Sequence, residues 1–110
     1  MSLTATPSEI EEDVGSVVPV VVRVDNPVPG QTYSLVIDDQ PVSGMIEDVE
    51  DDLEAGTISF TFTATTPIEF GMVDSIGVSV TDSEGNEGNL DIPVTVNEEQ
   101  VVQPPTLQSR

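Results

Sequence analysis

Oxygen-bearing side chains around residue 84 form the most evident candidate for a chemical site. Asp82, Glu84 and Asn86 stand at alternate positions, with Asp74 and Asp91 as further acidic residues nearby in the chain. Ca²⁺ takes about six to eight oxygen ligands from carboxylates, amides and carbonyls, so this spacing fits a calcium site. Asp, Gly and Asn are also the ordinary residues of a hairpin turn, which binds nothing. Both interpretations fit the sequence.

A second candidate is the acidic run from Glu47 to Glu54, in which six of the eight residues are Asp or Glu. Such a run suits cations or a basic partner, whereas the plainer interpretation is a solvated loop that aids solubility. Val49 and Leu53 are four residues apart, so a single helical turn within Glu47–Ala55 is a further alternative. The shorter run Glu11–Asp13 is open to the same interpretations, and we favour a solvated segment for both.

The composition excludes several kinds of chemistry. The 110 residues include 21 Asp and Glu but only two cations, Arg23 and Arg110, which gives a formal net charge of -19. The absence of His, Cys and Lys rules out Cys/His zinc sites, disulfides, His-activated nucleophiles and Schiff bases. Chance pairs of carboxylates lack a cleft that would raise a pKa for glycosidase chemistry. We therefore expect a protein that is not an enzyme.

The same composition limits the partners. Affinity for nucleic acid comes largely from Lys and Arg, so a chain this acidic is not expected to bind DNA or RNA. No apolar run approaches the roughly 20 residues of a membrane helix, which argues against a membrane partner. Residues 1–4 lack the basic and apolar regions of a signal peptide, so we expect a protein made in a cytoplasm and not exported by a cleaved signal.

The elements that must position these side chains are β-strands, because Val, Ile and Thr dominate and turn residues interrupt them at regular spacing. The clearest strand is 57–65, where Ile58, Phe60 and Phe62 alternate with Thr and Ser. Pro93 donates no ladder hydrogen bond, so we expect an open edge beside it. The predicted strands are 3–7, 17–25, 32–38, 42–47, 57–65, 74–82 and 89–97.

Two stretches resemble bacterial immunoglobulin-like domains. Pro29–Asp38 resembles their B–C corner and third strand. Ile76–Asn86, followed by Leu90–Val96, resembles their F–G hairpin, with the V-x-V-x-D-x-x-G-N ending shared by cadherin-like and related phage domains. The resemblance covers most of residues 3–97 and implies an all-β, immunoglobulin-like sandwich of about seven strands. The chain departs from antibody domains in lacking both cysteines and the core Trp.

The predicted domain spans residues 1–97, and residues 98–110 form an extended C-terminal arm. Pro104-Pro105 favours a polyproline conformation, and the aliphatic side chains of the arm have nothing local to pack against. The arm is either a frayed terminus or a segment that docks onto a partner or a neighbouring copy. In the second case the binding residues are Val101, Val102, Pro104, Pro105 and Leu107. A Thr/Ser-rich sheet face is the other place left for binding.

Domains with this resemblance serve as spacers, adhesive repeats or add-on modules of virion proteins. We therefore expect a structural protein of a bacteriophage virion, made in the host cytoplasm: a capsid decoration (cement) protein, or an accessory head or tail protein. Its partners would be virion structural proteins such as the major capsid protein, and copies of itself. The alternative is an immunoglobulin-like repeat of an adhesin on the bacterial cell surface, stabilised by Ca²⁺. No other cofactor is expected, and the acid-rich composition also fits a high-salt source.

Overall fold

The computed structural model describes residues 1–69 and 72–97, which form two four-stranded sheets. In the first sheet the strand order is β1-β3-β6-β5. Its strands are Leu3–Thr6 (β1), Val17–Val24 (β3), Thr57–Ala64 (β6) and Gly44–Asp52 (β5). In the second sheet the order is β2-β8-β7-β4. Its strands are Ile10–Asp13 (β2), Glu87–Asn97 (β8), Asp74–Asp82 (β7) and Tyr33–Asp39 (β4).

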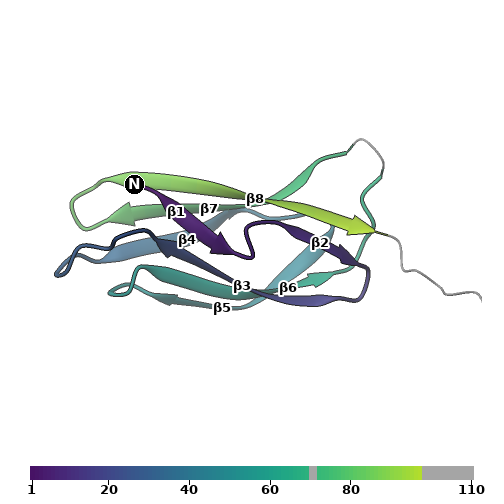
Figure 1. The fold of residues 1–110 in the computed structure, drawn as a ribbon, viewed down its shortest axis with the longest axis horizontal. Coiled ribbons are helices and arrows are strands. Elements are labelled where there is room, and N and C mark those ends of the chain that lie inside the picture. The colour runs from purple at the N-terminus through teal and green to yellow at the C-terminus, as the bar shows by residue number, and fades with distance from the viewer. Residues whose placement is uncertain (70–71, 98–110) are drawn as a thin grey trace, which may run out of the picture.

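The two sheets face each other as a sandwich, as Figure 1 shows. The order of β1, β3, β6 and β5 is the ABED order of a constant-type immunoglobulin sheet, and β4, β7 and β8 correspond to its CFG sheet. The predicted all-β sandwich is thus confirmed. None of the described residues forms a helix that could span a membrane.

The N-terminal segment is shared between both sheets. β1 pairs antiparallel with β3, and the chain then crosses through the cis Thr6–Pro7 peptide to β2, which pairs parallel with the end of β8. β1 covers β3 only from Val21 to Val24, so Pro19, which has no N–H to donate, stands beside an open edge. Pro93 likewise lies just outside the paired part of its strand, because β2 pairs with β8 only from Val94 to Asn97. The open edge predicted beside Pro93 is therefore confirmed.

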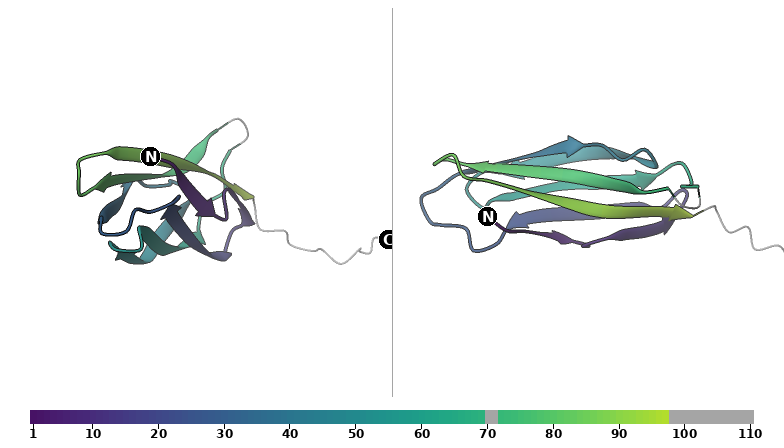
Figure 2. Two further views of the ribbon diagram at one scale, coloured as in Figure 1. Left: turned by 60° about the vertical axis from the view of Figure 1, so that its left-hand side comes forward. Right: turned by 90° about the horizontal axis from the view of Figure 1, so that it is seen from above.

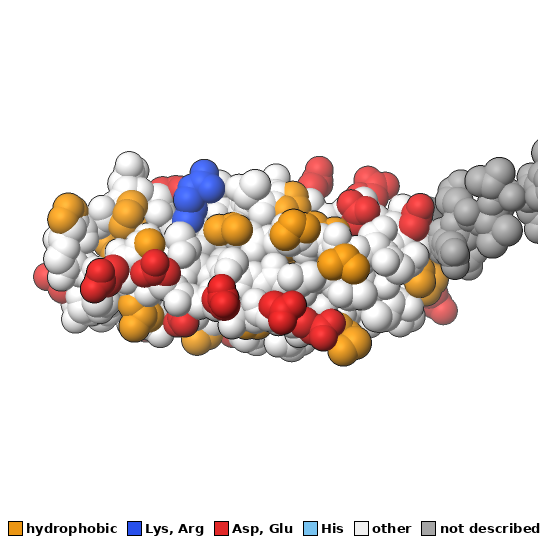
Figure 3. Space-filling view, turned by 90° about the horizontal axis from the view of Figure 1, so that it is seen from below, with side chains coloured by type: hydrophobic (Ala, Val, Ile, Leu, Met, Phe, Trp, Pro, Cys, Tyr) orange, Lys and Arg blue, Asp and Glu red, His pale blue; other side chains and the backbone are white. Residues whose placement is uncertain are grey.

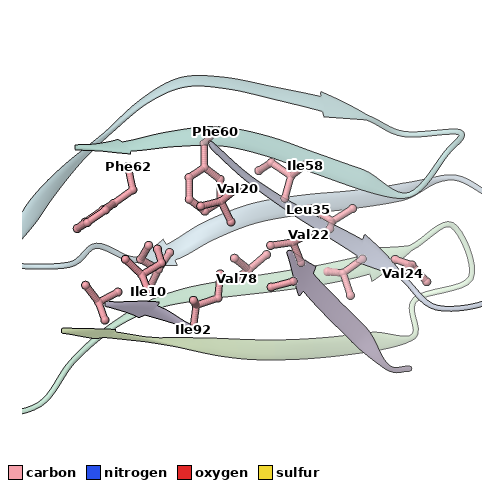
Figure 4. Packing of buried hydrophobic residues seen from close by; sticks show 14 of the residues in the cluster. Ile10, Val20, Val22, Val24, Leu35, Ile58, Phe60, Phe62, Val78 and Ile92 are labelled. Carbon is pink, nitrogen blue, oxygen red and sulfur yellow. The ribbon is translucent and has the colours of Figure 1, made fainter. Parts of the chain in front are cut away.

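The core lies between the sheets and consists of the side chains that alternate inward along each strand. Figure 4 shows Phe60 and Phe62 of β6 and Val20 and Val22 of β3 facing Ile92 and other side chains of the second sheet. Full burial of one such side chain stabilises the fold by roughly 1.5–3 kcal/mol. Three further apolar residues are only half-buried and pack at the margin of the core: Val18, Ile37 and Leu90.

Two acidic segments differ from their predictions. Glu11–Asp13 belongs to β2, which carries a single buried hydrophobic side chain, Ile10, and is held by pairing with β8. Glu47–Ala55 is neither a solvated loop nor a helical turn in its first part, because β5 continues to Asp52. A bulge with Asp48 at a φ of 54° lets the acids stay in solvent while β5 keeps pairing with β6. In these acidic segments apolar and polar residues do not alternate, so hydrogen bonding to the neighbouring strands β8 and β6 makes them β-strands.

The strands are oriented so that the chain enters the sandwich at one end and leaves at the other (Figures 1 and 2). We call these the amino end and the carboxyl end. The amino end holds Met1, the loop 25–32, the turn 53–56 and the hairpin 83–86. The carboxyl end holds the turn 14–16, the corner 40–43, the 65–73 loop, of which residues 70–71 are not described, and the last residues of β8.

Candidate functional site

The hairpin at the amino end brings Asp82, Glu84 and Asn86 together. The backbone N–H groups of Glu84 and Asn86 donate to Asp82 Oδ1 at 2.9 and 2.8 Å. The side-chain amide of Asn86 donates to Asp82 Oδ2 at 3.0 Å and, together with these backbone donors, holds the pKa of Asp82 below its ordinary value. Glu84 Oε1 accepts a hydrogen bond of 2.8 Å from Gln31 Nε2.

These oxygens therefore serve the turn itself, which is the second of the two interpretations of this segment. Asp74 stands at the opposite end of β7 from Asp82, and Asp91 pairs with Gly77 in mid-strand, so neither joins the hairpin. Within residues 1–69 and 72–97, no group of three or more acidic side chains is placed to hold a metal ion. Calcium binding at the hairpin stays a prediction.

The predicted binding residues of the arm lie outside the described residues, and the structure says nothing of their placement. They are Val101, Val102, Pro104, Pro105 and Leu107.

An apolar groove opens at the carboxyl end of the sandwich. Its rim carries the three most exposed large hydrophobic side chains of the described residues: Val73 (90% exposed), Val42 (79%) and Met72 (63%). The cavity has a volume of about 150 Å³, and Pro67 and Ile68 complete its apolar wall. We call it the carboxyl-end groove, and its other lining residues are Ser43, Thr66 and Glu69.

A buried carboxylate holds one wall of this groove in place. Asp74 is only 8% exposed, and it accepts hydrogen bonds from Val42 N (3.1 Å), Ser43 N (3.0 Å) and Ser43 Oγ. Three donors satisfy the carboxylate without a cation. The carbonyl of Ser43 in turn accepts from Thr65 N (2.9 Å) and Thr66 N (3.0 Å). The corner and the loop are thereby tied together, and Val42 is left in solvent.

The groove also adjoins the last strand, because Ile68 N donates to the carbonyl of Val96 at 3.0 Å. Sequence reasoning missed the groove and the role of Asp74. One signal was present: Met72 and Val73 are apolar residues in a segment that none of the predicted strands includes.

A second exposed surface is the outer face of the sheet β1-β3-β6-β5. Its middle is a column of half-buried hydroxyl side chains on β6, between exposed Val17 and Val21 of β3 and the acids of β5. Figure 3 shows this face, with hydrophobic side chains along its length and acidic ones along its lower edge and at its upper right. We call it the hydroxyl face. Its cross-strand rows are Val17-Thr63-Met45, Pro19-Thr61-Glu47, Val21-Ser59-Glu50 and Arg23-Thr57-Asp52.

The strand order defines an immunoglobulin-like sandwich, and the structure leaves these two surfaces open. The chain is similar to the BIgI domain of beta protein from S. agalactiae, whose structure was solved bound to CEACAM1. The two are 14% identical, with a TM-score of 0.57, and the match covers 90% of this chain and 98% of that domain. The likeness establishes the fold.

Two Yersinia pseudotuberculosis proteins are similar at lower TM-scores. The adhesin InvE is 25% identical with a TM-score of 0.46, and the match covers 88% of this chain. InvD is 24% identical with a TM-score of 0.40 over 83% of this chain. The chain spans 26% of the length of each. No family model and no curated protein matches the chain. The likeness to the BIgI domain confirms the resemblance to bacterial immunoglobulin-like domains for the fold.

Proposed function

We propose that this protein is a non-enzymatic immunoglobulin-like module of a bacterial surface protein, which holds and presents a protein-binding face. The observation that carries the proposal is the placement of Met1 and Asn97 at opposite ends of the sandwich. Domains with this polarity extend a chain when they are joined end to end, so each one adds length and exposes its sheet faces to the surroundings.

The hydroxyl face is the surface best suited to a partner. Interfaces between proteins combine an apolar centre with a polar rim, and here Val17, Pro19 and Val21 lie beside hydroxyl groups and an acidic margin. The acids of β5 favour a partner with a basic rim, because opposite charges steer encounter and fix orientation. The BIgI domain, which shares the fold, was solved bound to the protein CEACAM1 and supports a protein partner.

The virion interpretation requires the same fold and a different location, whereas the BIgI domain that shares the fold belongs to a bacterial protein. We therefore place the adhesin-type interpretation first. In both, the domain acts by contact and catalyses nothing.

Labelling with an antibody against the purified chain tests the location. Intact cells that express the protein should be labelled on their outer surface, and brief protease treatment of intact cells should remove the label. Cells with the gene deleted are the control. Label found only on purified bacteriophage particles would overturn the proposal and restore the virion interpretation.

A further inference from the structure

The carboxyl-end groove concentrates exposed apolar surface in one place. Single exposed hydrophobic residues need no explanation, whereas a grouped set indicates a contact surface. Val42, Met72 and Val73 are grouped on one groove, although they come from two separate segments of the chain. We propose that the C-terminal segment of the same chain, residues 98–110, folds back and fills this groove with its aliphatic side chains.

The first argument is position. Ile68 lines the groove and is hydrogen-bonded to Val96, one residue before the last described residue, Asn97. The segment therefore begins beside the groove. An extended chain spans at most about 3.6 Å per residue, so Val101 can reach roughly 14 Å from Asn97. That distance is sufficient for a site whose wall is bonded to the end of β8.

The second argument is size. A dry apolar cavity of roughly 150 Å³ holds one benzene-sized group, which is the size class of a single Leu or Val side chain. The groove has about this volume. The segment offers three such side chains: Val101, Val102 and Leu107. One of them is enough to fill the site, and Val101 and Val102 need the shortest connection.

The third argument is charge. All 21 acidic residues of the chain precede Gln100, so the last residues carry only Arg110 as a charged side chain. A domain with this excess of negative charge repels acidic segments, and Gln100–Arg110 contains no acidic side chain for it to repel.

The same chain is favoured over a second copy as the occupant. A short linker gives the tethered segment an effective concentration in the millimolar range, above the micromolar concentration of an ordinary solution. Pro104-Pro105 restricts the free segment and lowers the entropy lost on docking. The inference concerns a contact within the chain and does not depend on the proposed function.

Paramagnetic NMR on the full chain tests the inference. The chain has no cysteine, so Gln103→Cys provides a single position for a nitroxide label next to Val102. We expect the label to broaden the amide signals of Val42, Ile68 and Val73 several-fold more than those of Gly85 at the amino end. Reduction of the nitroxide gives the reference spectrum.

Three variants of the labelled chain make the result specific. Val42→Ser should reduce the broadening at Ile68 and Val73 at least two-fold, whereas Val36→Ser, at an exposed position on the outer face of β4, should leave it unchanged. Val101→Ser with Val102→Ser, outside the sandwich, should reduce it without affecting the fold. Broadening at Ile68 and Val73 that neither Val42→Ser nor the double Ser variant reduces would overturn the inference. A mixture of nitroxide-labelled chains without ¹⁵N and ¹⁵N-enriched chains without nitroxide tests for a second copy. Broadening of the ¹⁵N-enriched chains in this mixture would also overturn the inference, because the occupant of the groove would then be another chain.

Discussion

Replacing Asp74 with Ala should destabilise the domain through the donors that it leaves behind. Ser43 is 1% exposed, so Ser43 N and Ser43 Oγ lose their acceptor in a place that water does not reach. Each buried unsatisfied group costs about 1–3 kcal/mol. The backbone N–H of Val42 belongs to an exposed residue, so it can donate to water instead. Two buried donors, Ser43 N–H and the Ser43 hydroxyl, are left without an acceptor, and the cost of the hydroxyl is smaller because it can rotate. We therefore expect the free energy of unfolding to fall by about 3 kcal/mol.

Urea unfolding followed by far-UV circular dichroism measures this loss, since the chain has no Trp and a single Tyr for fluorescence. The matched control is Asp91→Ala, an exposed carboxylate in β8, which should change the free energy by less than about 0.5 kcal/mol. Ser43→Ala removes one of the orphaned donors, so the double variant with Asp74→Ala should lose less than the sum of the single variants. A loss at Asp74 no larger than at Asp91, or strict additivity with Ser43, would refute the reasoning.

Further measurements test other parts of the structure. A side chain at Gly44 would collide with the ring of Phe62 and the carbonyl of Thr63, so Gly44→Ala should lower the free energy of unfolding in urea by about 1–3 kcal/mol; an unchanged midpoint would contradict the packing described for β5. The pKa of Asp82 is lower in the folded chain than its ordinary value of 3.8, so its contribution to stability is present above that pH and is lost as the pH falls through the folded pKa. Thermal melts should therefore show a shallower acid decline for Asp82→Asn than for the wild type, and equal slopes would argue against the turn. Millimolar Ca²⁺ should raise the melting midpoint equally in the wild type and in Asp82→Asn; a rise that the variant loses would establish the calcium site. Sodium chloride should raise the midpoint between about 0.01 and 0.5 M by screening the net charge of -19, and a midpoint independent of salt would contradict this self-repulsion.

Alternation of apolar and polar residues was sufficient to predict the strands that bury one face along their whole length. The predicted strand 57–65 corresponds to Thr57–Ala64, and 74–82 corresponds to Asp74–Asp82. In these strands each inward side chain joins the core, so apolar and polar residues alternate at every second position of the sequence. The role of Asp82 in the turn could be predicted for a similar reason. Its hydrogen-bond donors, Glu84 and Asn86, are only two and four positions away in the sequence.

The features that were not predicted depend on contacts between distant segments. β2 and the second half of β5 are acidic, and they are strands because β8 and β6 offer hydrogen-bonding partners. Asp74 binds Ser43, which lies 31 residues away, and neither residue stands in a pattern that marks a buried pair. The carboxyl-end groove arises from two turns that meet only in the folded chain. Pairing and burial of this kind are properties of the whole sandwich.

The division of the N-terminal segment between the two sheets has a mechanical consequence. β2, near the N-terminus, and β8, which ends at Asn97, run parallel as neighbours from Ile10↔Val94 to Asp13↔Asn97. A pull on the two ends of the domain draws these strands past each other along their length. The hydrogen bonds between them are then loaded together in shear, instead of opening one after another as in a zipper. A chain of such domains would stay short under tension until this four-residue register gives way as a unit.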